Sequence, residues 1–293
     1  MPSLAEYIAD YALPIVVGLV LGLSAVIGLI LYGFVRYKVS LYHTLYGLWQ
    51  RAGGEKLAEK FFRRYPRLDD FVKQRIFPLA YLGVHIAVFF ALLVIALLTF
   101  SELIEALWES DEVVTFDLAL VDALQRRISA TTLQIFAAVT RLGDVTTIVV
   151  LGLLMGAVLL VKRQWVTFIA WTLTLLGGAL FNQVLKELIQ RERPEVMEPL
   201  IAAHGWAFPS GHAMGATFGY GMFAYLLLRK RKTPWRIPAI LFFVAVVLLI
   251  GASRIALQVH YFSDVIAGFS AGLIWLVICI TGTELALLRQ EKE

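Results

Sequence analysis

The sequence contains little cysteine and little charge. Cys279 is the one cysteine among 293 residues, so an intrachain disulfide is excluded. Charged residues make up 16% of the chain and apolar residues 59%, and the mean hydropathy is +0.76. An ordinary soluble domain has about 25% charged residues. The shortage of charge therefore excludes a soluble domain and indicates an integral membrane protein.

A basic leader, internal repeats and low-complexity segments are also missing. Glu6 and Asp10 precede the first apolar stretch and Arg36 and Lys38 follow it, the reverse of a secretory signal peptide. We therefore expect this stretch to remain in the mature protein. The net charge is +4 and the pI about 9.1, but the basic residues cluster beside apolar stretches, where membrane topology explains them. We expect no nucleic-acid partner.

Seven apolar stretches predict transmembrane helices. They are 17 to 27 residues long, enough to cross a bilayer as a helix. The predicted spans are 14–36, 78–104, 145–161, 165–188, 212–228, 237–253 and 264–286. The predicted fold class is therefore an all-α integral membrane protein with about seven spans.

The charges between the spans predict the orientation of the chain. Loop 37–77 has nine Lys/Arg against four acids, whereas loop 102–144 has eight acids and three arginines. Basic residues also follow the third span at 162–163 and the fifth span at 229–232. Because Lys and Arg collect in cytoplasmic loops, we expect a plasma (inner) membrane protein with its N-terminus outside and its C-terminus in the cytoplasm.

Two segments outside the spans have the spacing of amphipathic surface helices. Segment 39–77 suits the inner membrane surface, and segment 112–143 suits the outer one. We divide the chain accordingly into an N-terminal part, 1–77, with one span and a basic cytoplasmic segment, and a core, 78–293.

Lys186 and Arg193 stand at the end of the fourth predicted span. Seven residues are about two helical turns, so we expect both side chains on one helical face, with Pro194 ending the helix. A single base at a helix end usually only extends its charge to the membrane surface. Arg191, off this face, fits that role better.

Pro209-Ser210-Gly211-His212 leads into the fifth predicted span. Ser210 suits a helix N-cap, and Gly211 lets a ligand approach the exposed N–H groups. Taken alone, these residues are only a helix start. His212 adds an imidazole that titrates near neutral pH and can give a proton to a leaving oxygen. His204 has no such context and is assigned to a loop.

Ser253-Arg254, His260 and Asp264 stand where the sixth span ends and the seventh begins. His260 and Asp264 are four residues apart, so we expect them on one helical face, with the carboxylate holding one imidazole nitrogen protonated and the other free as a nucleophile. The predicted topology puts all three motifs at the outer surface, where bases run against the positive-inside pattern and are functional candidates. Together these groups predict a site that handles a phosphoryl group.

The three motifs together resemble the three-part signature of the type 2 phosphatidic acid phosphatase family. They are Lys186-x6-Arg193-Pro194, Pro209-Ser210-Gly211-His212 and Ser253-Arg254-x5-His260-x3-Asp264. Vanadium haloperoxidases share this site. The resemblance covers about residues 78–286 and implies a six-helix core, to which the first span is an addition. It also implies a membrane lipid phosphatase without cofactor or metal, which the predicted topology places at the outer surface. The carboxylates near the motifs make no persuasive metal-ligand set.

The resemblance also implies a role for each residue of the site. His260 would attack phosphorus and form a phosphohistidine, Asp264 would orient it, and His212 would protonate the departing oxygen. The phosphoryl oxygens would be bound by Lys186, Arg193, Ser210, Gly211 and Arg254. The implied partners are a phosphorylated lipid substrate and the surrounding membrane lipids. Phosphatidic acid, phosphatidylglycerol phosphate and polyprenyl diphosphates are all compatible substrates.

Other functions remain open on the sequence alone. A lipid phosphotransferase could use the same site and pass the phosphoryl group to a second lipid. A haloperoxidase would need permanently held vanadate, and a serine protease that pairs Ser210 with His260 would leave the three bases unused. A transporter or scaffold that binds phosphorylated lipids would not need two histidines and a carboxylate together.

Overall fold

The computed structural model describes residues 4–23, 80–109, 111–196, 200–201, 204–231 and 233–290, together with positions 25, 26, 29, 51 and 63. The chain forms two compact units, Met1–Val26 with Leu93–Glu293, and Ile27–Leu92. Three predicted features lie outside the described residues. They are the boundary at 77/78, segment 39–77 except for two positions, and most of the second half of the first predicted span. The first unit carries the predicted motifs.

The described residues form helices and contain no strand. The helices are α1 (Leu4–Asp10), α5 (Ala80–Glu109), α6 (Asp111–Arg127), α7 (Ala130–Thr140), the 3-10 turn η1 (Arg141–Gly143), α8 (Val145–Val161), α9 (Trp165–Ile189), α10 (Gly211–Leu228), α11 (Thr233–Ala256) and α12 (Phe262–Gln290). The predicted all-α class is confirmed. The long apolar runs of the sequence coincide with the long helices because a run of this kind can bury its backbone polar groups in lipid only as a helix.

Several of these helices are long and apolar enough to cross a membrane. Five are found among the described residues: Phe89–Glu109, Ala130–Val161, Trp165–Ile189, Trp235–Ala256 and Phe262–Gln290. The pair Leu4–Asp10 and Ala12–Leu23, bent by 93°, makes a sixth if it is one span. α10, the predicted fifth span, is a helix but is not among them. A multi-pass membrane protein is therefore confirmed, whereas the predicted count of seven spans is not.

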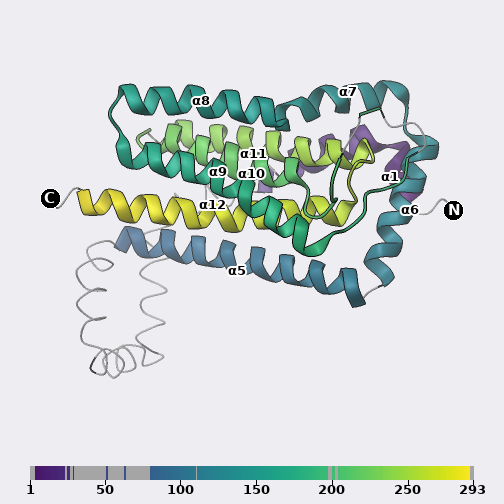
Figure 1. Ribbon diagram of the computed structural model, residues 1–293, viewed down its shortest axis with the longest axis horizontal. Helices are drawn as coiled ribbons and strands as arrows, with labels where there is room; N and C mark the ends of the chain where they lie inside the picture. Colours follow the sequence, from purple (N-terminus) through teal and green to yellow (C-terminus); the bar gives the residue numbers. More distant parts are fainter. Residues whose placement is uncertain are drawn as a thin grey trace. The chain divides into compact units, whose positions relative to one another are not determined.

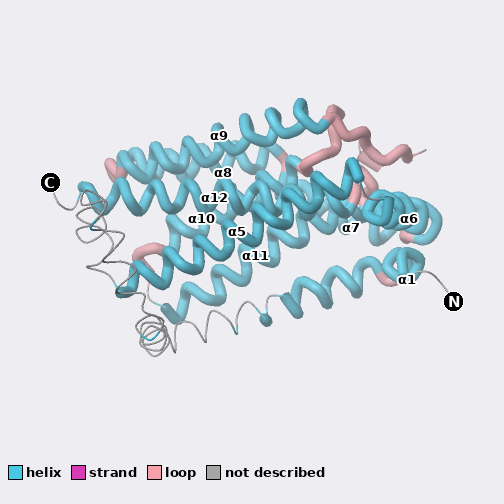
Figure 2. The backbone as a smooth tube through the Cα atoms, turned by 90° about the horizontal axis from the view of Figure 1, so that it is seen from below, coloured by secondary structure: helices cyan, strands magenta, loops and turns pink. Residues whose placement is uncertain are grey.

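α10 packs against α9, α11 and α12 within the first unit, and these helices lie side by side in Figures 1 and 2. Glycines allow the closest of these approaches. A Cβ added at Gly268 of α12 would lie 2.7 Å from the Ser210 carbonyl oxygen and 2.9 Å from the Ala213 Cβ. At Gly272, it would lie 2.8 Å from the Met214 carbonyl oxygen. The start of α12 therefore lies directly against the start of α10.

α6 runs across the ends of the other helices of this unit, as Figure 1 shows. One face of α6 packs on α1, and Arg127 of α6 binds Asp10 at 2.8 Å and Glu6 at 3.1 Å. The buried residues of this contact are Ala5, Ala9, Ala12, Leu120, Ala123 and Leu124. The predicted segment 112–143 is thus α6 and α7, and α7 continues through η1 into the apolar stretch of α8.

Candidate active site

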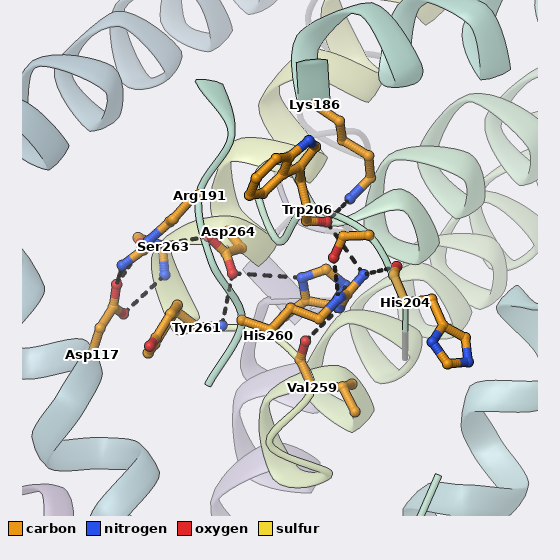
Figure 3. A network of polar contacts seen from close by, with 12 residues as sticks. Asp117, Lys186, Arg191, His204, Trp206, Val259, His260, Tyr261, Ser263 and Asp264 are labelled. Atoms are coloured by element: carbon orange, nitrogen blue, oxygen red, sulfur yellow. Dashed lines mark hydrogen bonds and ion pairs between the residues drawn. The ribbon is translucent and has the colours of Figure 1, made fainter. Parts of the chain in front are cut away.

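The predicted site residues come together at one end of four helices. Lys186 lies in the last turn of α9, Arg254 in the last turn of α11, and Asp264 in the first turn of α12. Ser210 is the N-cap of α10, which begins at Gly211. Figure 3 shows Lys186, His260 and Asp264 converging from these separate elements.

His260 is the buried centre of this cluster, with only 2% of its surface exposed. Its Nε2 lies 3.1 Å from Nη1 of Arg193. A guanidinium nitrogen can only donate, so Nε2 accepts and the proton of the neutral ring lies on Nδ1. Nδ1 is 3.5 Å from Oδ2 of Asp264, longer than an ordinary hydrogen bond. Burial lowers the pKa of His260 to about 3, so at neutral pH the ring is uncharged and Nε2 keeps its lone pair.

Asp264 is held from two sides. Arg191 Nη1 donates to Oδ1 at 2.6 Å, and the backbone N–H of Tyr261 donates to Oδ2 at 2.9 Å. The prediction that His260 and Asp264 share a helical face is wrong, because α12 begins at Phe262 and His260 precedes it. The two side chains meet because the turn between α11 and α12 folds His260 back onto the helix start.

Arg193 is positioned by backbone carbonyl groups. It donates to the carbonyl oxygens of Val259 at 2.6 Å and Gly205 at 2.8 Å. His204 and Trp206 also accept from it through their carbonyl oxygens, at 3.1 Å and 3.3 Å, and Lys186 Nζ donates to the same Trp206 oxygen. The exposed loop around His204 therefore contributes main-chain acceptors that aim two bases at the site (Figure 3).

The route by which Arg193 reaches the site differs from the prediction. α9 ends at Ile189, and Gln190 has a left-handed conformation with φ of 50° that turns the chain away from the helix axis. Arg193 consequently lies in a loop and shares no helical face with Lys186. Pro194 does not end the helix, because the helix has already ended five residues earlier.

Unpaired buried donors mark this cluster. In the part of the chain that the structure describes, four buried side-chain nitrogen or oxygen atoms have no hydrogen-bond partner. Three of the four lie in this cluster: Ser210 Oγ, Arg254 Nε and His260 Nδ1. Buried polar atoms are nearly always paired. Arg254 is otherwise fixed by a 2.8 Å bond from Nη1 to Thr140 Oγ1. Ser210 Oγ and Arg254 Nε, together with the open N-terminus of α10, suit a bound oxyanion, whereas His260 Nδ1 is directed toward Asp264.

His212 faces Asp144. Its Nε2 lies 2.9 Å from Oδ1 of Asp144, the N-cap of α8. Both residues border a cavity of about 520 Å³ that also reaches Arg254. The cavity is lined further by Gln134, Ala137, Ala138, Thr140, Arg141, Leu200 and Ile201. His212 and Arg254 thus share one cavity, the space from which a ligand can meet both.

Known proteins match part of this chain. A family model described as the PAP2 superfamily matches residues 165–286. Phosphatidylglycerophosphatase B of Bacillus subtilis (strain 168) is 32% identical over 143 residues, which are 48% of this chain and 70% of that protein. A crystal structure of a transmembrane PAP2 type phosphatidylglycerolphosphate phosphatase from Bacillus subtilis matches with a TM-score of 0.59 and 29% identity, covering 66% of this chain and 96% of that chain.

The chain belongs to the PAP2 superfamily. The family resemblance read from the three motifs is therefore confirmed. The matched region, 165–286, contains every residue that the motifs contribute to the cluster. The solved relative is a transmembrane protein, in agreement with the multi-pass helical fold described above.

Three residues around the PAP2 motifs were missed by the sequence reasoning. Arg191, assigned to the membrane surface, is largely buried and bonded to Asp264 and Asp117. These two carboxylates outweigh the effect of burial and raise the pKa of Arg191. Asp117 and Asp144 lie outside the matched region. A signal existed for Asp117, since it is three residues before Leu120 and so falls on the buried stripe of α6.

Proposed function

We propose that this protein is an integral membrane phosphatase that hydrolyses phosphorylated lipids through a phosphohistidine on His260. One observation carries the proposal. The imidazole of His260 is buried and neutral, and its Nε2 lone pair lies next to the Arg193 guanidinium. Arg254 and Ser210 carry unpaired donors in the same cluster. A phosphoryl group at this point would meet a nucleophile and the donors that stabilise its charge.

The proposed reaction has two steps. His260 Nε2 attacks phosphorus, the bond from phosphorus to the lipid oxygen breaks, and His212 gives that oxygen a proton. Water then attacks the phosphohistidine, His212 takes a proton from it, and the P–N bond breaks to release inorganic phosphate. Asp264 keeps Nδ1 directed away from the phosphorus. Positive charge and donors are supplied by Lys186, Arg193, Arg254, Ser210 and the N–H of Gly211.

Phosphatidylglycerol phosphate is the substrate that we propose first, because both relatives named above are phosphatases of that lipid. Phosphatidic acid and polyprenyl diphosphates are the other members of the proposed class. The distribution of Lys and Arg between the loops supports an outward-facing site in the plasma (inner) membrane, periplasmic where the cell has an outer membrane. The proposed catalytic core is 78–293.

We expect the purified full chain to release inorganic phosphate from phosphatidylglycerol phosphate in detergent micelles that contain a chelator. Vanadate should inhibit the reaction, because it adopts the trigonal-bipyramidal geometry of the transition state. The measurement is phosphate release across phosphatidylglycerol phosphate, phosphatidic acid and a polyprenyl diphosphate. Radiolabel recovered in a second lipid would instead indicate a phosphotransferase. Absence of turnover of all three substrates, with vanadate and phosphate still bound, would favour a binding protein.

His212→Ala should separate the two chemical steps. A nitrophenyl phosphate has a leaving group that needs no proton, so the first step should survive, whereas hydrolysis of the intermediate loses its base. We expect a burst of about one nitrophenol per active site, followed by slow turnover. Lipid phosphate esters, whose alkoxide needs the proton, should lose about 10²- to 10⁴-fold in rate. Equal losses on both substrates, without a burst, would contradict the role given to His212.

A further inference from the structure

Asp117 is a buried carboxylate that the proposed reaction does not use. It belongs to α6, outside the three motifs, and only 1% of its surface is exposed. Its Oδ1 accepts the backbone N–H of Ser263 at 3.1 Å, and its Oδ2 accepts Arg191 Nη2 at 2.9 Å and the Ser263 hydroxyl. Burying a carboxylate is costly unless it is paired, so the role of this residue depends on those contacts.

Arg191 connects Asp117 with the catalytic pair. Its two terminal nitrogens are divided between the carboxylates, with Nη2 on Asp117 and Nη1 on Asp264 at 2.6 Å. The guanidinium also lies over the ring of Tyr261, 4.2 Å from the ring centroid. Figure 3 shows this network from Asp117 through Arg191 to Asp264 and His260. Because the planar Arg191 guanidinium is bonded through both terminal nitrogens, it is held in one orientation. That orientation sets the position of the Asp264 carboxylate.

We propose that Asp117 is a positioning residue that acts on His260 through Arg191 and Asp264. With the Asp117 carboxylate bonded to Nη2, Arg191 gives only one nitrogen to Asp264, which leaves Oδ2 for the Tyr261 N–H and for His260 Nδ1. Without that charge, both guanidinium nitrogens are free to take both oxygens of Asp264, because the bidentate pair is the stronger arrangement. Asp264 then turns from His260, whose Nδ1 already lies 3.5 Å away.

Asp122→Asn provides a matched control for Asp117→Asn. Asp122 lies on the same helix and also pairs with an arginine, Arg126, but its side chain is 56% exposed and this pair is not among the contacts that link Asp117, Arg191 and Asp264. Both substitutions remove one carboxylate charge from α6 and keep the side-chain shape. Only the variant at 117 removes a contact in the network that leads to His260.

The test rests on the proposed function for its kinetic arm but not for its spectroscopic arm. We expect Asp117→Asn to lower kcat for lipid phosphate release by about 10- to 100-fold, with KM within about threefold, because the nucleophile is misaligned and the binding groups are not. In ¹⁵N-histidine-labelled protein, which has five histidines, His260 should change from the Nδ1–H form to a mixture of tautomers. Asp122→Asn should leave both readouts unchanged.

Arg191→Lys keeps the charge but has no fork to span both carboxylates, so it should reproduce the loss of kcat if Asp117→Asn does not fold. A folded Asp117→Asn with wild-type kcat and an unchanged His260 spectrum would overturn the proposal, as would a wild-type Arg191→Lys. If the wild-type chain hydrolyses no phosphorylated lipid, the proposed function fails, while the His260 spectrum still decides the role of Asp117.

Discussion

His260→Ala should abolish phosphate release, with kcat lowered by roughly 10⁴- to 10⁶-fold, as is usual when a covalent nucleophile is removed. The contacts of Arg193 and His212 explain why neither can substitute for His260. Arg193, beside Nε2, has donors but no lone pair, and His212 is engaged with Asp144 at 2.9 Å. The measurement is single-turnover phosphate release, with acid-stable and acid-labile phosphoprotein separated after quenching.

The same variant should still bind an oxyanion. Lys186, Arg193 and Arg254 all remain, and removal of a buried imidazole leaves their donors in place. Vanadate or phosphate binding, measured by calorimetry, therefore serves as the control for folding. Retained hydrolysis above about one hundredth of the wild-type rate, in a sample free of contaminating phosphatase, would exclude His260 as the nucleophile.

Gly268→Ala should damage both stability and activity. The added Cβ would lie 2.7 Å from the Ser210 carbonyl oxygen and 3.2 Å from the Met214 backbone nitrogen, so α12 must move away from the start of α10. Overpacking of this kind costs about 1 to 3 kcal/mol. The same displacement strains the bond from the Ser210 N–H to the Asp264 carbonyl, 2.9 Å long. We expect a lower melting temperature and about 10²-fold lower kcat.

Gly282→Ala is the matched control on the same helix. Nothing lies within 4 Å of a Cβ added there, and alanine is a better helix former than glycine by about 1 kcal/mol. Its melting temperature should therefore equal or exceed that of the wild type, with unchanged turnover. If Gly268→Ala behaved like Gly282→Ala, the close packing of α12 on α10 would not be what positions Ser210.

The positions of several long helices could be predicted closely from the sequence. The predicted spans 145–161 and 165–188 correspond to α8 and α9 with an error of at most one residue. These limits are local properties, because the apolar runs end at charged residues such as Lys162 and Arg163. The family, too, could be recognised from local spacing, since each of the three motifs is short and its residues stand at fixed separations.

The contacts within the site could not be predicted in the same way. Helical periodicity predicted that Arg193 shares a helical face with Lys186. The left-handed conformation of Gln190 ends α9 at Ile189, so Arg193 lies beyond the helix. Periodicity also placed Arg191 outside the site, whereas it lies between Asp117 and Asp264. If a helix ends one residue earlier or later, the side chains that follow point in a different direction. No local pattern in this segment specifies where α9 ends.

The sequence by itself determined that this is an all-helical membrane protein of the PAP2 superfamily, because hydropathy and motif spacing depend only on the order of residues in the chain. Only the tertiary structure decided which atoms meet. Asp117 precedes Asp264 by 147 positions, yet both bind Arg191 at less than 3 Å. Such a contact depends on how α6 crosses the ends of the other helices, and that crossing is set by packing between distant segments rather than by any residue's neighbours in sequence.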